Sequence, residues 1–171
     1  GTCHVKMTGG TLGVPRTLAQ IAAHPVTCYI FGGGKGDPRD HFNSRTNVGK
    51  AEVEVSGGII YGSVFGGGED GHVLGDAIVT IKDTKDESDN VIASPWIGTW
   101  GTSYVDGNVF GAGRGFSGLA LTAGSVGGNA KVNISGGRVG KFEVYNDDTN
   151  HQRVVRPLEQ SMTKVGGPDD T

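Results

Sequence analysis

The sequence predicts an all-β fold, a right-handed parallel β-helix (β-solenoid) with irregular loop insertions and one short helix near the N-terminus. Two observations support this prediction. A phrase that ends in Phe and a run of small residues, mostly Gly, occurs three times, at 29–34, 63–68 and 108–113. After each copy comes a strand-like segment that begins with Ala, and the offsets from Phe to Ala are 20, 12 and 20 residues.

The strand-like segments alternate between apolar and polar residues, which is the period of a half-buried strand. Ala51, Val53 and Val55 are expected to point inward, and Ala130, Val132 and Ile134 repeat the pattern. Paired glycines follow two of these segments and mark a bend after each strand.

One repeat carries too few apolar residues to close a core by itself. Stacking the copies would bury the Phe, Val, Ile and Ala positions as continuous rows, which is how repeat proteins acquire a core. The competing interpretation is an antiparallel sandwich or barrel in which the Gly-Gly pairs are ordinary turns.

The pattern divides the chain into a repeat domain at 1–145 and a cap, linker or extension at 146–171. Within the first part, Pro15 and the segment that follows it predict a short helix at about 15–24. The charged run at 82–90 is predicted to be a solvated loop tip. Because the chain begins inside a strand-like segment without Met, we expect it to be a piece of a longer protein.

Composition argues against several classes of protein. Glycine makes up 32 of 171 residues without a collagen period, and the formal net charge is −3 with the two signs mixed. The absence of a basic stripe disfavours a nucleic-acid partner, and no apolar run reaches the length of a membrane span. No nucleophile is flanked by its usual partners, so the sequence predicts no catalytic residue and no enzyme activity.

Acidic and imidazole side chains follow two of the glycine runs. If successive loops stack, these side chains would converge and bind a divalent cation. Oxygen donors favour calcium, the cofactor expected here, whereas the added His side chains would favour a transition metal. The alternative is a pair of solvated polar loops, because Lys35, Arg39 and Arg45 lie among them. The candidate ligands are Asp37, Asp40, His41, Glu69, Asp70 and His72.

Two further groups of residues carry candidate chemistry. Trp96, Trp100 and Tyr104 would form an aromatic platform for a sugar, or else cover a flank of the core, as large aromatic side chains usually do. Cys3 and Cys28 would form a disulfide, or else remain as two buried thiols.

The repeated phrases resemble the glycine-rich repeats of very large surface proteins of Bacteroidota. The resemblance rests on Val-Phe-Gly-Gly-Gly at 64–68 and on Val-x-Val-Ser-Gly-Gly at 53–58 with its variant at 132–137. It covers about residues 1–145 and implies an extracellular or cell-surface location with a structural or adhesive role. It supplies no catalytic residue.

The sequence therefore predicts a non-enzymatic structural or adhesive segment of a large secreted or surface protein. Its expected partners are an extracellular glycan, a protein surface, or copies of itself. Two alternatives remain open: a β-helix that binds or degrades a polysaccharide, and a filament subunit.

Overall fold

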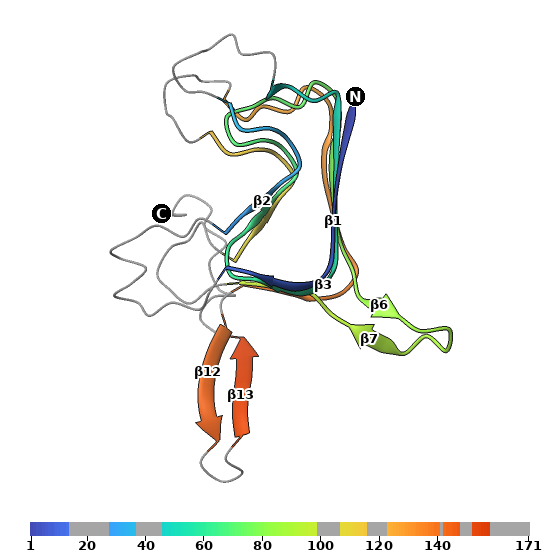
Figure 1. Ribbon diagram of the computed structural model, residues 1–171, viewed down its shortest axis with the longest axis vertical. Helices are drawn as coiled ribbons and strands as arrows, with labels where there is room; N and C mark the ends of the chain where they lie inside the picture. The colour runs from blue at the N-terminus through green and yellow to red at the C-terminus, as the bar shows by residue number, and fades with distance from the viewer. Residues whose placement is uncertain are drawn as a thin grey trace, which may run out of the picture.

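The computed structural model describes residues 1–13, 28–36, 46–98, 107–115 and 123–140, together with the backbone of two strands at 142–147 and 152–157. The elements within these ranges are thirteen β-strands, and the described residues contain no α-helix. Figure 1 looks close to the stacking direction, so the strands of successive repeats overlie one another.

The described strands stack as one starting layer and three repeats. The starting layer is β1 (Thr2–Leu12). Repeat 1 contains β2 (Ile30–Phe31) and β3 (Lys50–Ile60). Repeat 2 contains β4 (Val64–Phe65), β5 (Ala77–Ile81) and β8 (Trp96–Ile97), and repeat 3 contains β9 (Val109–Phe110), β10 (Ala130–Ile134) and β11 (Arg138–Val139).

Equivalent residues of successive repeats pair in parallel and in register. Val53 of β3 pairs with Val79 of β5, which pairs in turn with Val132 of β10. On the other side of β3, Val53 pairs with Val5 of β1. Because paired residues of parallel strands point to the same face, each apolar position becomes a row through the stack.

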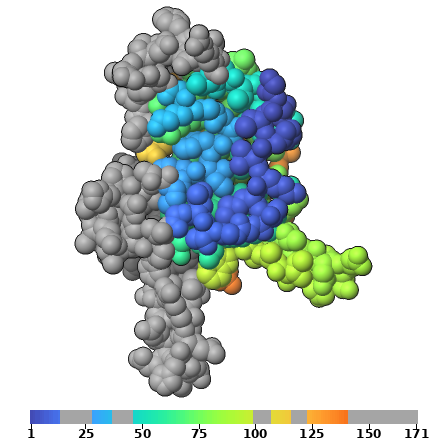
Figure 2. Space-filling view, viewed as in Figure 1, coloured from blue at the N-terminus to red at the C-terminus, as the bar shows by residue number. Residues whose placement is uncertain are grey.

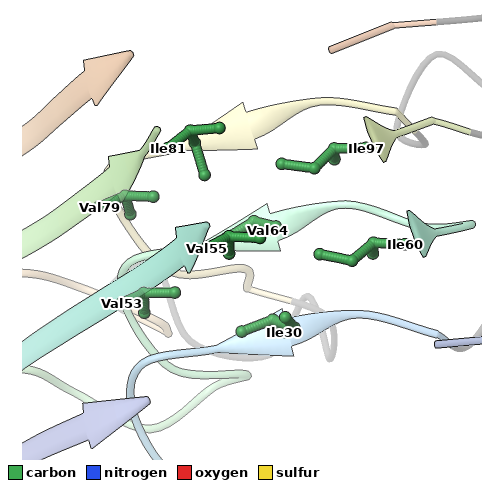
Figure 3. Close-up of a cluster of buried hydrophobic side chains, with 8 residues drawn as sticks. All are labelled: Ile30, Val53, Val55, Ile60, Val64, Val79, Ile81 and Ile97. Atoms are coloured by element: carbon green, nitrogen blue, oxygen red, sulfur yellow. The ribbon is translucent and has the colours of Figure 1, made fainter. Parts of the chain in front are cut away.

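These rows form the core of the molecule. Figure 3 shows its buried aliphatic side chains, one set above the next, from strands of repeats 1 and 2. The cluster consists of Ile30, Val53, Val55, Ile60, Val64, Val79, Ile81 and Ile97. Alternation of apolar and polar residues along β3 and β5 is thus matched by alternation of buried and half-buried side chains.

The phenylalanines of the repeated phrase form a second row, in the sheet β2-β4-β9. The ring centroids of Phe31 and Phe65 lie 4.8 Å apart, and those of Phe65 and Phe110 lie 4.7 Å apart, with nearly parallel planes. Glycine follows each Phe because the backbones approach closely there: a Cβ on Gly32 would collide with the carbonyl oxygen of Gly66.

The paired glycines explain the bends that end the strand-like segments. The second glycine of each pair has a positive φ: 84° at Gly10, 90° at Gly58 and 82° at Gly137. Residues with a Cβ rarely adopt this conformation, so the pair recurs wherever a repeat turns this corner.

Two antiparallel hairpins interrupt the parallel stack. In repeat 2 the corner glycines are absent, and β6 (Thr84–Lys85) and β7 (Val91–Ala93) form a hairpin that projects from the stack in Figure 1. The charged run at 82–90 therefore begins at the base of this hairpin and includes its tip. The other hairpin pairs β12 (Phe142–Asp147) with β13 (Gln152–Pro157), and so spans the predicted boundary between residues 145 and 146.

The prediction of a right-handed parallel β-helix is wrong. The large sheet, with the order β10-β5-β3-β8-β11 and β1 beside β3, curls like half of a barrel. The physical reason is that β3 (Lys50–Ile60) runs through the corner at Gly58, whose φ is 90°, so the sheet bends within a strand and continues around the corner. Near the N-terminus the structure has the strand β1, and the short helix predicted at 15–24 lies outside the described residues.

Candidate functional site

The acidic candidates of repeat 2 lie where successive repeats meet. Lys35 and Glu69 form a parallel bridge, and Glu69 forms another with Arg114, so charges of alternating sign line up across three repeats. The Nζ of Lys35 lies 3.5 Å from Oε1 of Glu69. The carboxylate of Glu69 is therefore part of an ion pair between repeats.

Asp70 and His72 also join successive repeats. Asp70 has a φ of 61°, and its backbone N–H donates to the carbonyl of Arg114 at 2.9 Å. The Nδ1 of His72 lies 2.9 Å from Oγ of Ser125, and its backbone N–H donates to Oδ1 of Asn47. The described residues beside these loops therefore pair between successive repeats, as Lys35 does with Glu69 and Val48 does with Val73.

Only half of the predicted cation ligands lie within the described residues. Asp37, Asp40 and His41 lie outside the described residues, whereas Glu69, Asp70 and His72 lie within them. Across residues 1–13, 28–36, 46–98, 107–115 and 123–140, no group of three His, Cys, Asp or Glu side chains could hold a metal ion.

Of the three aromatic candidates, Trp96 is described and Trp100 and Tyr104 are not. Trp96 is half-buried at the start of β8 and pairs with Arg138 of β11. The guanidinium carbon of Arg138 lies 4.8 Å from the centroid of the indole ring, which is cation–π distance. A sugar stacking on that face would have to displace the arginine.

Cys3 and Cys28 are both half-buried, and no disulfide joins them in the structure. Cys3 lies on β1 in the row that continues as Ala51, Ala77 and Ala130. Its position in a row of small side chains matches the packing of a small apolar residue.

The outward face of the large sheet carries a line of paired charges. Glu54 of β3 lies between Lys6 of β1, at 3.3 Å, and Lys82, at 2.9 Å. The hydrogen bond from Lys82 is the largest influence on the Glu54 carboxyl and, with the bond from Lys6, holds its pKa below the ordinary value against the opposing effect of burial.

Glu52, two residues earlier, pairs with β1 and with its own strand. Its carboxylate contacts Nζ of Lys50 at 2.6 Å and Nδ1 of His4 at 2.9 Å. The Lys50 hydrogen bond lowers the pKa of Glu52, and the same contact raises the pKa of Lys50. The outward face is therefore held by contacts between the starting layer and repeats 1 and 2.

Two aspartates that the sequence pattern did not indicate join repeat 3 to repeat 2 by hydrogen bonds. Oδ1 of Asp76 accepts the backbone N–H of Asn129 at 2.8 Å, and Oδ1 of Asp83 accepts that of Gly137 at 2.9 Å. Asp83 also accepts the hydroxyl of Ser94 at 2.6 Å. A signal was present in the sequence, because Asp83 stands where the other copies have a corner glycine, and a carboxylate there supplies an acceptor to the next repeat.

The last repeat exposes apolar side chains that the sequence placed in the core. Phe110, Val132, Ile134 and Val139 are all exposed, although their counterparts in repeat 2 are buried. Residue patterns assign these side chains an inward direction but do not show that repeat 3 lies at the end of the described stack.

No family model, curated protein or solved structure matches this chain. Within the part of the chain that the structure describes, there is no helix with the length and apolar character needed to cross a membrane.

Proposed function

We propose that this chain is a non-enzymatic structural or adhesive segment of a large extracellular or cell-surface bacterial protein. The observation that supports the proposal best is the in-register stacking of three repeats, whose interior is filled by aliphatic rows. Repeats that contact only their neighbours form an extended, stiff body.

The adhesive part of the proposal rests on the β6–β7 hairpin. Val91 and Ile92 of this hairpin are exposed to 54% and 64%, next to each other on an element that projects from the stack. Loops that project from a rigid scaffold commonly carry binding residues. We propose an extracellular protein or glycan surface as the partner.

The location is tested by labelling intact cells of the source organism with an antibody against this chain, and by brief protease treatment of the same cells. Labelling of intact cells and loss of the antigen after protease treatment are the expected results. Labelling that requires cell lysis would contradict a surface location.

The adhesive role is tested by adsorbing the chain on beads and measuring capture by panels of extracellular proteins and polysaccharides. The double variant V91S/I92S should lose most of the capture, whereas L74S should retain it, because Leu74 is equally exposed (64%) but lies at a corner of the stack. New reducing ends in a polysaccharide after incubation would instead favour the polysaccharide-degrading alternative.

A further inference from the structure

The β6–β7 hairpin owes its exposure to the direction in which it projects, not to a place at an end of the described stack. It belongs to repeat 2, whose strand β5 has β3 on one side and β10 on the other. The hairpin leaves the stack sideways in Figure 1, and in Figure 2 it stands clear of the body, in yellow-green. Layers before or after the described stack would add to it along the stacking direction, which is not the direction of the hairpin.

Hydrogen bonds hold the hairpin at its base and at its tip. At the base, Oγ1 of Thr84 donates to the backbone carbonyl of Ser56 in repeat 1, at 2.8 Å. At the tip, Oδ1 of Asp86 accepts the backbone N–H of Ser88 at 2.9 Å and that of Asn90 at 2.8 Å. A contact surface that is already ordered loses less conformational entropy on binding, so more of its interaction energy appears as affinity.

Carboxylates lie next to the two exposed aliphatic side chains of the hairpin. Asp86, Glu87 and Asp89 are exposed at the tip. The Nζ of Lys85 lies 2.9 Å from Oδ1 of Asp89. The segment 85–92 therefore carries three carboxylates and one ammonium group, a net charge of −2. Such a surface is complementary to one that combines apolar with cationic side chains.

Two features of the hairpin disfavour a glycan as its partner. Sites for small ligands such as sugars are concave and lined by apolar and aromatic side chains, whereas this hairpin projects, and its residues 82–94 include no aromatic side chain. Its net negative charge also repels acidic polysaccharides. A protein segment, in contrast, supplies apolar and cationic side chains together.

We propose that the β6–β7 hairpin binds a protein segment that combines Lys or Arg with apolar side chains. The apolar side chains of that segment pack on Val91 and Ile92, and its cations face Glu87 and the neighbouring carboxylates. The charges speed encounter and restrict the choice of partner, while the apolar contact sets the lifetime of the complex. The inference rests on the adhesive role proposed above and names the class of partner within it.

The first test is binding of the 171-residue chain to an array of synthetic peptides that vary systematically in Lys or Arg content and in Leu, Ile or Val content. Polygalacturonate and dextran on the same surface represent acidic and neutral polysaccharides. We expect binding to peptides that carry both cationic and apolar side chains. This binding should fall several-fold when the salt concentration rises from about 0.05 M to about 0.5 M.

Three results of the array would overturn the proposal. The first is equal binding to apolar peptides that lack cations. The second is a preference for acidic peptides or for either polysaccharide. The third is binding to no peptide at all.

Two variants of equal charge test whether the hairpin is the site. E87Q removes a carboxylate from the hairpin and T2K adds an ammonium group at an exposed position of β1, away from the hairpin, so each raises the net charge by one. E87Q should weaken binding of the cationic, apolar peptides about two- to fivefold, whereas T2K should leave it unchanged. Equal effects of the two variants would overturn the proposal, because attraction would then not depend on the hairpin.

The apolar part of the contact is tested with V91S/I92S. This variant should weaken binding of the same peptides about tenfold or more, because both aliphatic contacts are lost. L74S changes an equally exposed side chain at a corner of the stack and should leave binding unchanged. Circular dichroism checks that all variants fold. Unchanged binding by V91S/I92S would overturn the proposal.

The two proposals fail separately. If V91S/I92S loses capture of extracellular proteins or glycans while the chain shows no preference for cationic peptides, the adhesive role stands and the partner class is wrong. If the hairpin binds cationic, apolar peptides but intact cells are not labelled, the partner class stands and the surface location is wrong.

Discussion

Individual glycines determine where this chain can turn. Gly58 has a φ of 90°, and a Cβ placed there would lie 2.7 Å from the carbonyl oxygen of Gly10 and 2.7 Å from Cε of Met7. Gly9 has no positive φ and no atom within 4 Å of an added Cβ. The two glycines look alike in the sequence, but only Gly58 is required by its conformation and its neighbours.

Replacing Gly58 by Ala should therefore lower the free energy of unfolding by about 1–3 kcal/mol, through backbone strain and the close contacts. Gly9→Ala is the matched control and should change it by no more than about 0.5 kcal/mol. Urea unfolding followed by circular dichroism measures both. Equal effects of the two variants would contradict the assigned role of the positive φ.

At the scale of elements, strands of adjacent layers are joined by their side chains as well as by the backbone ladder. Glu54 connects β1 and β3 to the residue after β5, since its carboxylate contacts Lys6 and Lys82. Both lysines are partly exposed, so each pair contributes modestly.

The Glu54 pairs make stability depend on pH in a defined direction. The folded pKa of Glu54 lies below its unfolded value of about 4.5, so the contribution is fully present above pH 4.5 and is lost as the pH falls through the folded pKa. At pH 7, E54Q should lower the free energy of unfolding by about 0.5–1 kcal/mol. The difference from the parent protein should shrink below pH 4.5.

Thermal unfolding between pH 3 and pH 7 checks this prediction. E87Q is the control, because Glu87 lies at the exposed tip of the β6–β7 hairpin. A difference between E54Q and the parent protein that stays constant from pH 7 to pH 3 would show that the ion pairs are not its source.

At the scale of the whole molecule, the position of a repeat in the stack determines how much a core residue contributes. Val79 and Val132 occupy one row and pair with each other, yet Val79 is fully buried and Val132 is not. A neighbouring layer on each side is what completes the burial of a repeat.

Val79→Ala should therefore lower the free energy of unfolding by about 2–3 kcal/mol, and Val132→Ala by less than about 1 kcal/mol. Denaturant titrations measure the two values. Similar costs for both variants in dilute protein would contradict the layer order.

The candidate site could be predicted only in part, because contacts between distant segments depend on register. Alternating residues indicate which side chains of β3 point inward, but not that Glu69 lies beside Lys35 and Arg114, or His72 beside Ser125. The predicted cluster treated Glu69 as a cation ligand, whereas in the structure its carboxylate pairs with a lysine of the preceding repeat.

By itself the sequence determined the strand positions of the repeats, their inward residues and the need for glycine at the corners, because these depend on local conformation and on a period of two. Curvature, closure and the ends of the stack are properties of the assembled layers. The tertiary structure decided that the large sheet curls without forming a right-handed β-helix, and that a hairpin replaces the corner of repeat 2. It also decided that Val132, Ile134 and Val139 are exposed at the end of the described stack. A repeated pattern predicts the burial of a side chain only when its repeat has a neighbouring layer on each side.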